Sequence, residues 1–386
     1  MKKTFTTMKK RKHLYVTIKG TLRCNLACQY CYGRDNHSIA KQMTTEEVSK
    51  ALLFTRDYAV EQGATSLTLC WHGGEPLLMA SVLPSLIEEA NRLFSFIDIP
   101  VFHGLQTNGV SLIPNNFGFI KQYLNGGIGV SLDLFSSYRT FPDGTVSTDL
   151  VVKNIDRALA EGIRFGAINL ITQDNRNKIK EIYEFYKERN INVRLARVFP
   201  INEEDTTGNP MYLSDEEFAH AMSDYFDIWA NDPKPALNRD ITSLVGDLLL
   251  GKPSLCYRER ECHNRYLALS PGGDIFTCAE FDVPESVVGN FLTQSAKEFI
   301  ASDARQRLAA KAPVPKDCKG CKFERICHGG CFRERFTLGY PYRCRSNYLY
   351  WEHIAQWLAT KGMTLYMLDG KTAEESRAIL SRLLTS

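Results

Sequence analysis

The 386-residue sequence lacks any apolar run that approaches the ~20 residues of a membrane-spanning helix. It also lacks a signal-peptide pattern, because the basic start leads into a short, mixed stretch at 13–20 that is typical of a strand. Internal repeats and low-complexity tracts are missing, and the net charge is only +3. We therefore expect a cytoplasmic protein with no membrane partner and no strong electrostatic attraction to nucleic acid.

Acidic residues are absent from the first 13 positions, which hold six lysines and arginines. We interpret 1–12 as a basic, solvated N-terminal tail. The alternative is that these basic residues bind an acidic peptide.

Cysteine, in contrast, is abundant, with 12 residues in the chain. In a reducing compartment this number points to metal or redox chemistry rather than to disulfides. Three of the cysteines, Cys24, Cys28 and Cys31, lie within eight residues at spacing C-x₃-C-x₂-C. A structural zinc site needs four ligands, and a disulfide leaves an odd thiol. An iron–sulfur cluster on three cysteines keeps one iron open for a substrate or cofactor.

Apolar, strand-like runs alternate with helical patterns through the first half of the chain. The expected strands are 13–20, 65–74, 99–109, 127–134, 164–172 and 191–199, and the helices between them are 44–63, 79–96, 114–124, 148–161 and 175–189. This alternation predicts an α/β fold with a parallel sheet that curls toward a barrel. Six units are too few for a full eight-fold barrel, so we expect a partial barrel over 13–210.

The pattern changes after residue 210. Residues 211–255 are expected to form a helical linker region with helices at 212–231 and 238–250. Residues 256–345 are rich in cysteine and contain one hairpin that turns at Gly272–Gly273. The region 346–386 is expected to close the chain with helices at 346–361 and 372–384.

The stretch "CNLACQYC" resembles the C-x₃-C-x-Φ-C signature of the radical S-adenosylmethionine (SAM) enzymes, with Tyr30 as the aromatic residue. The resemblance implies a partial (β/α)₆ barrel and a [4Fe–4S] cluster whose open iron binds SAM. It further implies reductive cleavage of SAM to methionine and a 5′-deoxyadenosyl radical, with an electron donor such as flavodoxin or ferredoxin as a partner.

Further motifs of this family follow the expected strands. "GGEP" at Gly73, Gly74, Glu75 and Pro76 resembles the motif that holds the SAM ammonium, with Glu75 as an anion for that cation. By the same resemblance, the other residues expected at SAM are Asn108, Ser131, Asp133 and Arg139. Asp133 could equally cap a helix or form a turn. Cys70, in an apolar strand, is expected to be a small buried side chain.

Eight further cysteines lie between 256 and 344, enough for two fully ligated clusters or, on chemistry alone, two structural zincs. With "LSPGGDIFTC" between them, they resemble a SPASM domain. The resemblance implies one auxiliary [4Fe–4S] cluster on Cys256, Cys262, Cys278 and Cys331, and a second on Cys318, Cys321, Cys327 and Cys344. The total is then three [4Fe–4S] clusters.

Radical SAM proteins with this extension mostly modify peptides or protein side chains. Anaerobic sulfatase maturases place an acidic base directly after the third cysteine of the first auxiliary set, where this chain has Ala279. The nearest acids, Glu280 and Asp282, are the candidate catalytic bases. The stretch "SLDLFSSYRTFPDGT" also lacks the "SLDG" continuation common in sulfatase maturases. It more closely resembles the short maturases that crosslink an aromatic ring to a nearby carbon in a ribosomally made precursor peptide, forming a three-residue cyclophane. Formylglycine formation with a shifted base is the alternative.

Two further expectations follow. Only 23 residues precede Cys24, so no N-terminal leader-binding domain is expected. An iron–sulfur electron carrier is the alternative that is not an enzyme, although a carrier would have no use for the Gly73–Pro76 motif.

Overall fold

The computed structural model describes residues 12–33, 41–124, 127–200, 208–281 and 283–362. Three expectations lie outside these residues: almost all of the basic tail, the candidate base Asp282, and the last helix at 372–384.

The described strands form one nine-stranded sheet in the order β6-β5-β4-β3-β2-β1-β7-β8-β9. The strands are β1 (His13–Thr21), β2 (Ser66–Gly73), β3 (Val101–Thr107), β4 (Gly127–Ser131), β5 (Arg164–Ile171), β6 (Asn192–Arg197), β7 (Tyr266–Leu269), β8 (Asp274–Phe276) and β9 (Gly289–Asn290). Strands β1 to β6 pair in parallel with their neighbours. The six strands expected for the partial barrel are all present, with small shifts at their ends.

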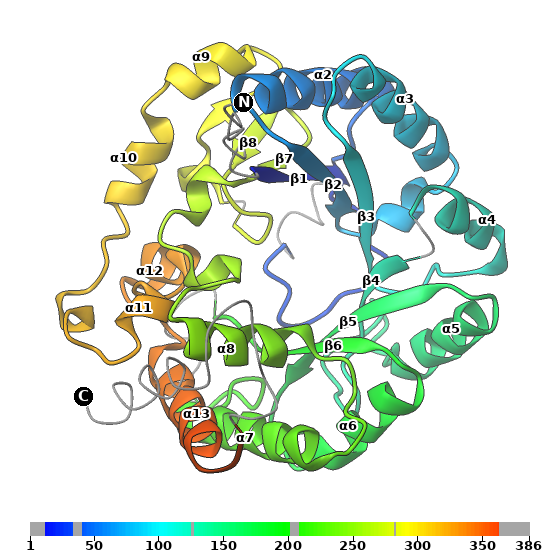
Figure 1. Cartoon of the computed structure of the whole chain (residues 1–386). Coiled ribbons are helices and arrows are strands. Elements are labelled where there is room, and N and C mark those ends of the chain that lie inside the picture. The colour runs from blue at the N-terminus through cyan, green and yellow to red at the C-terminus, as the bar shows by residue number, and fades with distance from the viewer. Residues whose placement is uncertain (1–11, 34–40, 125–126, 201–207, 282, 363–386) are drawn as a thin grey trace, which may run out of the picture.

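Five helices cover the outer, convex face of this curved sheet (Figure 1). They are α2 (Thr45–Glu61), α3 (Leu83–Ser95), α4 (Pro114–Tyr123), α5 (Thr148–Ala160) and α6 (Ile179–Glu188). Alternate strand residues such as Leu14, Val16 and Ile18 are fully buried against them, because successive side chains of a strand point to opposite faces. The expected α/β partial barrel is therefore confirmed.

The cysteine-rich half of the chain adds to the same sheet. Strand β7 pairs in parallel with β1, with Tyr266 opposite Tyr15, and β8 returns antiparallel to β7. The expected hairpin is confirmed, and Gly272 (φ +86°) and Gly273 (φ +94°) adopt the left-handed conformation that its turn requires. A hairpin this short is not stable alone, and pairing with β1 supplies the support that it needs.

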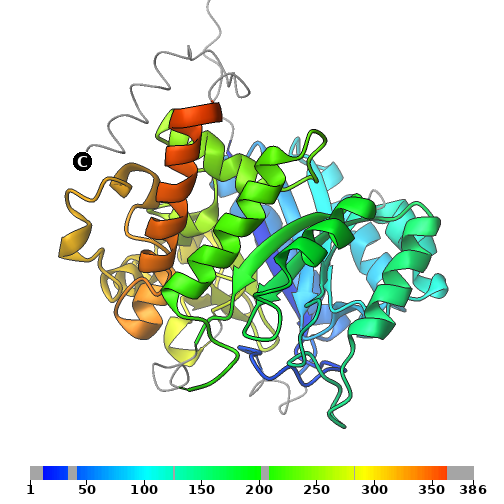
Figure 2. The same cartoon turned by 90° about the horizontal axis from the view of Figure 1, so that it is seen from below.

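Further helices follow β6 in the described part of the chain. They are α7 (Asp215–Asn231), α8 (Arg239–Leu250), α9 (Ala296–Ala301), α10 (Ala304–Ala310), α11 (Glu324–Cys327), α12 (Phe332–Leu338) and α13 (Cys344–Trp357), followed by a π-helical turn at Leu358–Gly362. Helices α7 and α13 lie side by side (Figure 2). Helix α9 packs on α2, with the rings of Phe54 and Phe299 5.7 Å apart, so one hydrophobic core joins the two halves.

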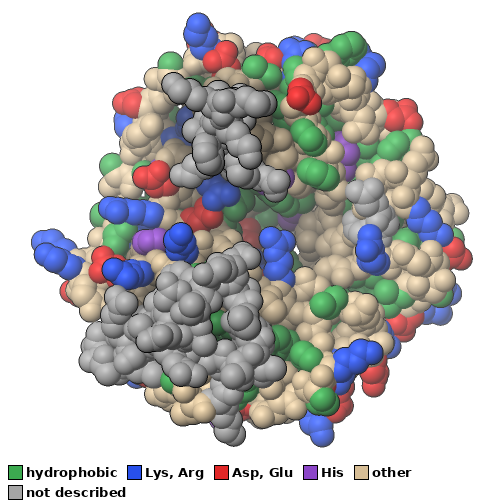
Figure 3. Space-filling view, in the orientation of Figure 1, with side chains coloured by type: hydrophobic (Ala, Val, Ile, Leu, Met, Phe, Trp, Pro, Cys, Tyr) green, Lys and Arg blue, Asp and Glu red, His purple; other side chains and the backbone are tan. Residues whose placement is uncertain are grey.

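None of the described helices is long and apolar enough to cross a bilayer. On the face shown in Figure 3, basic and acidic side chains are interspersed, as the small net charge implies.

Candidate active site

A cavity of about 250 Å³ lies where the carboxyl ends of the parallel strands meet the cysteine-rich half. This is the end at which parallel α/β folds place their active sites. Its walls combine residues from the loop after β1, the ends of β2, β4 and β6, and the segments around Cys278 and Cys331. The expected site residues on these walls are Cys24, Cys28, Tyr30, Cys31, Gly73, Gly74, Asn108, Ser131, Arg139, Glu280 and Cys331.

The three N-terminal cysteines lie on one side of this cavity. The amide of Leu26 and the side-chain amide of Asn108 donate to the sulfur of Cys24, at 3.5 and 3.6 Å. Burial raises the pKa of the Cys28 thiol to about 11. A thiolate at this position therefore needs a positive partner such as iron.

The glycine pair after β2 lets two backbone segments approach closely. A Cβ on Gly73 would lie 2.0 Å from the carbonyl oxygen of Thr21, and one on Gly74 would lie 2.2 Å from that of Arg23. The amide of Gly74 donates to Thr21 at 2.8 Å. Glycine is needed here because these contacts hold the strand end against the start of the cysteine loop.

The side chain of Glu75 was expected at the SAM ammonium, but the structure buries it behind the wall of the cavity. Its side chain is fully buried, and its carboxylate accepts hydrogen bonds from the amides of Leu77 (2.9 Å) and Asn108 (2.7 Å) and from the hydroxyl of Thr107 (2.8 Å). Burial raises the pKa of Glu75, and these hydrogen bonds oppose that effect. Glu75 and the buried Pro76 lie behind the cavity wall, so it is the backbone of Gly73 and Gly74 that faces the cavity.

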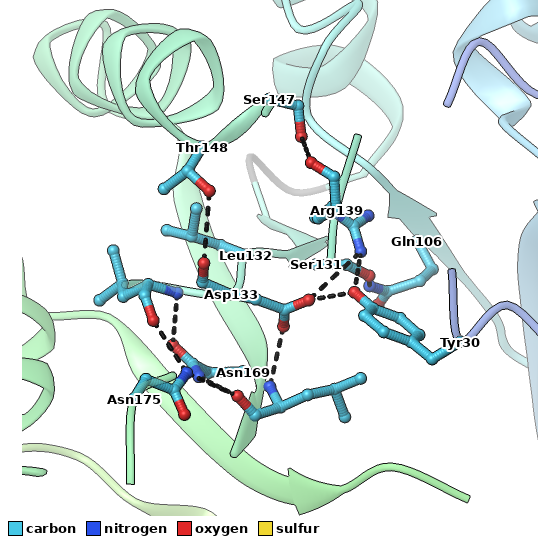
Figure 4. A network of polar contacts seen from close by, with 12 residues as sticks. Tyr30, Gln106, Ser131, Leu132, Asp133, Arg139, Ser147, Thr148, Asn169 and Asn175 are labelled. Atoms are coloured by element: carbon cyan, nitrogen blue, oxygen red, sulfur yellow. Dashed lines mark hydrogen bonds and ion pairs between the residues drawn. The ribbon is translucent and has the colours of Figure 1, made fainter. Parts of the chain in front are cut away.

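Asp133 also lies behind the wall, in a buried network with Tyr30 and Arg139 (Figure 4). The Tyr30 hydroxyl donates to the Asp133 carboxylate, and Arg139 donates to the Tyr30 oxygen at 3.1 Å. The amide of Leu170 donates to the other carboxylate oxygen at 2.8 Å. The structure thus uses Asp133 to hold Tyr30 and Arg139, and these two side chains reach the cavity.

Ser131, at the end of β4, lines the cavity and accepts a hydrogen bond from Gln106 at 3.1 Å. Gln106 lies directly over Gly129, where a Cβ would be 2.0 Å from its side-chain oxygen. The glycine therefore makes room for the residue that orients Ser131.

The eight later cysteines fall into two sets of neighbours. The pKa of Cys262 is raised to about 12, first by burial and then by Cys331 and Cys256. Burial, then Glu280 and Cys331, raise the pKa of Cys278. In the other set, burial and then Cys344 raise the pKa of Cys327 to about 12. Burial, Cys318 and Cys321 raise the pKa of Cys344. The cysteines that influence one another in this way belong to the same group of four in the resemblance, and the assignment of ligands to two clusters stays a prediction.

These cysteines fit iron–sulfur clusters chemically, since each set offers four thiols at one place.

Glu280 is brought to the same cavity as the N-terminal cysteines. Its side chain is 57% exposed, and its carboxylate accepts from Arg333 at 3.1 Å. Partial desolvation beside the cavity raises the pKa of Glu280, but the positive charges of Arg333, Arg194 and Arg343 outweigh this and leave the pKa below its ordinary value. Glu280 is therefore held as a carboxylate that can accept a proton.

Sequence reasoning missed several residues of the site. Tyr32, Phe199, Arg333 and Tyr342 line the cavity, and the buried Arg335 interacts electrostatically with cysteines of both later sets. Arg333 and Arg335 closely follow Cys331, which is the only local signal that marks them. The others come from segments whose approach to the cavity depends on the fold.

Three thiols beside a cavity at the end of a partial barrel, with eight more cysteines in the second half of the chain, fit an iron–sulfur enzyme. The radical SAM superfamily matches residues 18–186, and the SPASM iron–sulfur cluster-binding domain matches residues 256–322. The chain therefore carries a radical SAM domain followed by a SPASM domain, and it is an enzyme of the radical SAM type.

Two relatives are similar over nearly the whole chain. The serine-type anaerobic sulfatase-maturating enzyme of Bacteroides thetaiotaomicron is 25% identical, over 90% of this chain and 91% of the relative. The cysteine-type enzyme of Clostridium perfringens is 22% identical, over 86% of this chain and 93% of the relative.

Solved structures share the fold. Native anSMEcpe with bound AdoMet and the Cp18Cys peptide superposes with a TM-score of 0.79 at 20% identity, over 92% of this chain and 100% of that chain. Streptococcus suis SuiB bound to the precursor peptide SuiA gives a TM-score of 0.59 at 15% identity, over 86% and 75% of the two chains.

Proposed function

We propose that this enzyme removes a hydrogen atom from a side chain of a ribosomally made precursor peptide and joins that carbon to a nearby aromatic ring. The observation that carries the proposal is the position of Glu280, whose carboxylate opens onto the same cavity as Cys24, Cys28 and Cys31. A crosslink to a ring requires a base for the displaced ring proton at the place where the radical reacts.

The residues divide this work between them. Cys24, Cys28 and Cys31 would hold the SAM-binding cluster, and the backbone of Gly73 and Gly74, Asn108, Ser131 and Arg139, which line the same cavity, would hold SAM. When bound, these groups supply the hydrogen-abstracting radical, and the auxiliary clusters supply an acceptor for the surplus electron. Glu280 accepts the ring proton, and Arg333 keeps its carboxylate in place.

A second candidate function is the formation of formylglycine in a sulfatase. The similarity over 90% of the chain to a serine-type sulfatase-maturating enzyme favours it. Ala279 after Cys278 counts against it, although Glu280, one residue further on, is near enough in sequence to serve as a shifted base. Both reactions need a peptide, a radical, a base and an electron acceptor.

The test is anaerobic incubation of the reconstituted protein with SAM, a reductant and the peptide encoded beside its gene, followed by tandem mass spectrometry. A crosslink removes two hydrogen atoms and blocks fragmentation between the joined residues. Serine oxidation removes the same mass, but its aldehyde reacts with a hydrazide probe. An aldehyde, or unchanged mass with deuterium incorporated at Cα, would overturn the crosslink.

A further inference from the structure

One wall of the cavity is built from cations and aromatic rings that pack against one another. Its six residues, here called the cation–aromatic wall, are Lys19, Tyr32, Arg333, Phe199, Tyr342 and Arg197, and all of them line the cavity. They come from β1, the loop after Cys31, α12, the end of β6 and the loop before α13. No pair along this wall is close in sequence except Arg197 and Phe199.

The contacts along the wall are continuous. The charged end of Lys19 and the guanidinium of Arg333 each lie 5.3 Å from the centre of the Tyr32 ring. Arg333 also lies 3.9 Å from the centre of the Phe199 ring. The rings of Phe199 and Tyr342 meet edge to face at 6.2 Å, and Arg197 lies 4.1 Å from the centre of Tyr342.

Two polar groups of this wall are buried and have no hydrogen-bond partner among the described residues. They are the hydroxyl of Tyr342 and the Nε of Arg197. Tyr342 is 9% exposed, and the Arg197 side chain is 5% exposed. Buried polar groups are usually satisfied, so an orphaned donor at a cavity indicates that a ligand oxygen completes it.

We infer that the cation–aromatic wall is the subsite that receives an aromatic side chain of the substrate peptide, with the hydroxyl of Tyr342 donating to a carbonyl of that peptide. Flat guanidinium and ring surfaces favour another flat ring over an aliphatic group of the same size. This inference rests on the proposed function, and it names the part of the cavity that selects the substrate.

The position of Glu280 makes this wall useful for the reaction. Arg333 belongs to the wall and also donates to the Glu280 carboxylate at 3.1 Å. A ring stacked along the wall therefore lies on the same side of the cavity as the base that is proposed to take its proton. Arg333 acts here as a positioning residue for both the ring and the base.

The experiment measures binding rather than turnover. The reconstituted full-length protein with SAM is titrated anaerobically with N-acetyl-phenylalanine amide and with N-acetyl-cyclohexylalanine amide. The two compounds are similar in size, but only the first has an aromatic ring. We expect the aromatic amide to bind about threefold to fivefold more tightly. Equal dissociation constants for the two amides would overturn the inference.

Three variants locate the effect. In Phe199→Leu the preference for the aromatic amide should fall toward one, and in Phe199→Tyr it should persist. Phe96→Leu removes a ring that is 77% exposed at the end of α3 and should keep the full preference. A preference that survives in Phe199→Leu places the ring elsewhere and overturns the inference.

Tyr342→Phe tests the orphaned hydroxyl. It should weaken both amides about equally, by about threefold, because the donor binds the shared backbone carbonyl. Unchanged affinities of this variant for both amides would show that the Tyr342 hydroxyl does not bind the peptide carbonyl. Neither amide can be crosslinked, so the binding measurements are independent of the mass spectrometry that tests the proposed function. A crosslinked peptide together with equal affinities for the two amides would overturn this inference alone. A preference for the aromatic amide without any crosslink would overturn the proposed function alone.

Discussion

The hydroxyl of Tyr30 donates a hydrogen bond to the carboxylate of Asp133, and this bond joins the loop of the N-terminal cysteines to the end of β4. Arg139 lies beside both groups, 3.1 Å from the Tyr30 oxygen and 3.9 Å from the Asp133 carboxylate. A loop that holds three metal ligands is thereby fixed to the barrel by a buried polar contact.

Tyr30→Phe should destabilise the protein by about 1–3 kcal/mol, because it leaves the buried Asp133 carboxylate without one of its donors. Thermal unfolding under anaerobic conditions measures the change. Tyr123→Phe is the matched control, because Tyr123 donates to Glu88 at the exposed surface. If both variants unfold at the same temperature as the parent, the Tyr30–Asp133 bond does not support the fold.

Gly74→Ala should destabilise the protein by about 1–3 kcal/mol or more and lower the occupancy of the first cluster. The added methyl would lie 2.2 Å from the backbone oxygen of Arg23, which cannot move without shifting Cys24. Gly118→Ala is the control, since nothing lies within 4 Å and the exposed position in α4 favours alanine by ~0.5–1 kcal/mol. Denaturant unfolding and iron analysis separate the two variants, and parental values in Gly74→Ala would contradict the close approach.

Replacing Cys24, Cys28 and Cys31 together by alanine should remove about four of about twelve iron atoms per chain and abolish 5′-deoxyadenosine formation. The auxiliary clusters should remain, because their cysteines lie in separate sets. Cys70→Ala, at a buried position in β2, should keep the full iron content. Iron and sulfide analysis with chromatography of the nucleoside products provides the measurement, and loss of iron from Cys70→Ala would disprove the division of ligands.

Glu280→Gln should leave 5′-deoxyadenosine formation intact and lower the yield of modified peptide by about 10²-fold or more, because the ring proton loses its acceptor. Glu285→Gln, at the nearby short helix Pro284–Ser286, should retain full yield. The two products are quantified in the same reaction by mass spectrometry. Full yield of modified peptide from Glu280→Gln would exclude Glu280 as the base.

Local patterns in the sequence predicted much of the fold. The strands from β1 to β6 were predicted because their apolar residues repeat within each segment. Thr44 and Glu47 form a capping box at the start of α2 with both of its hydrogen bonds present, so this helix boundary depends only on residues close in the sequence. The resemblance of "CNLACQYC" to the radical SAM signature could be read from the sequence, because the three cysteines lie within one short loop.

The sequence by itself therefore determined the elements, the family and the cysteines available as ligands. Only the tertiary structure decided that β7 joins β1, that Glu75 and Asp133 lie behind the cavity wall, and that Arg333 holds Glu280 beside a row of rings. The physical reason is distance along the chain. Contacts such as Tyr30–Asp133 depend on how the sheet curves and on which strand ends meet, and no local pattern of residues encodes that.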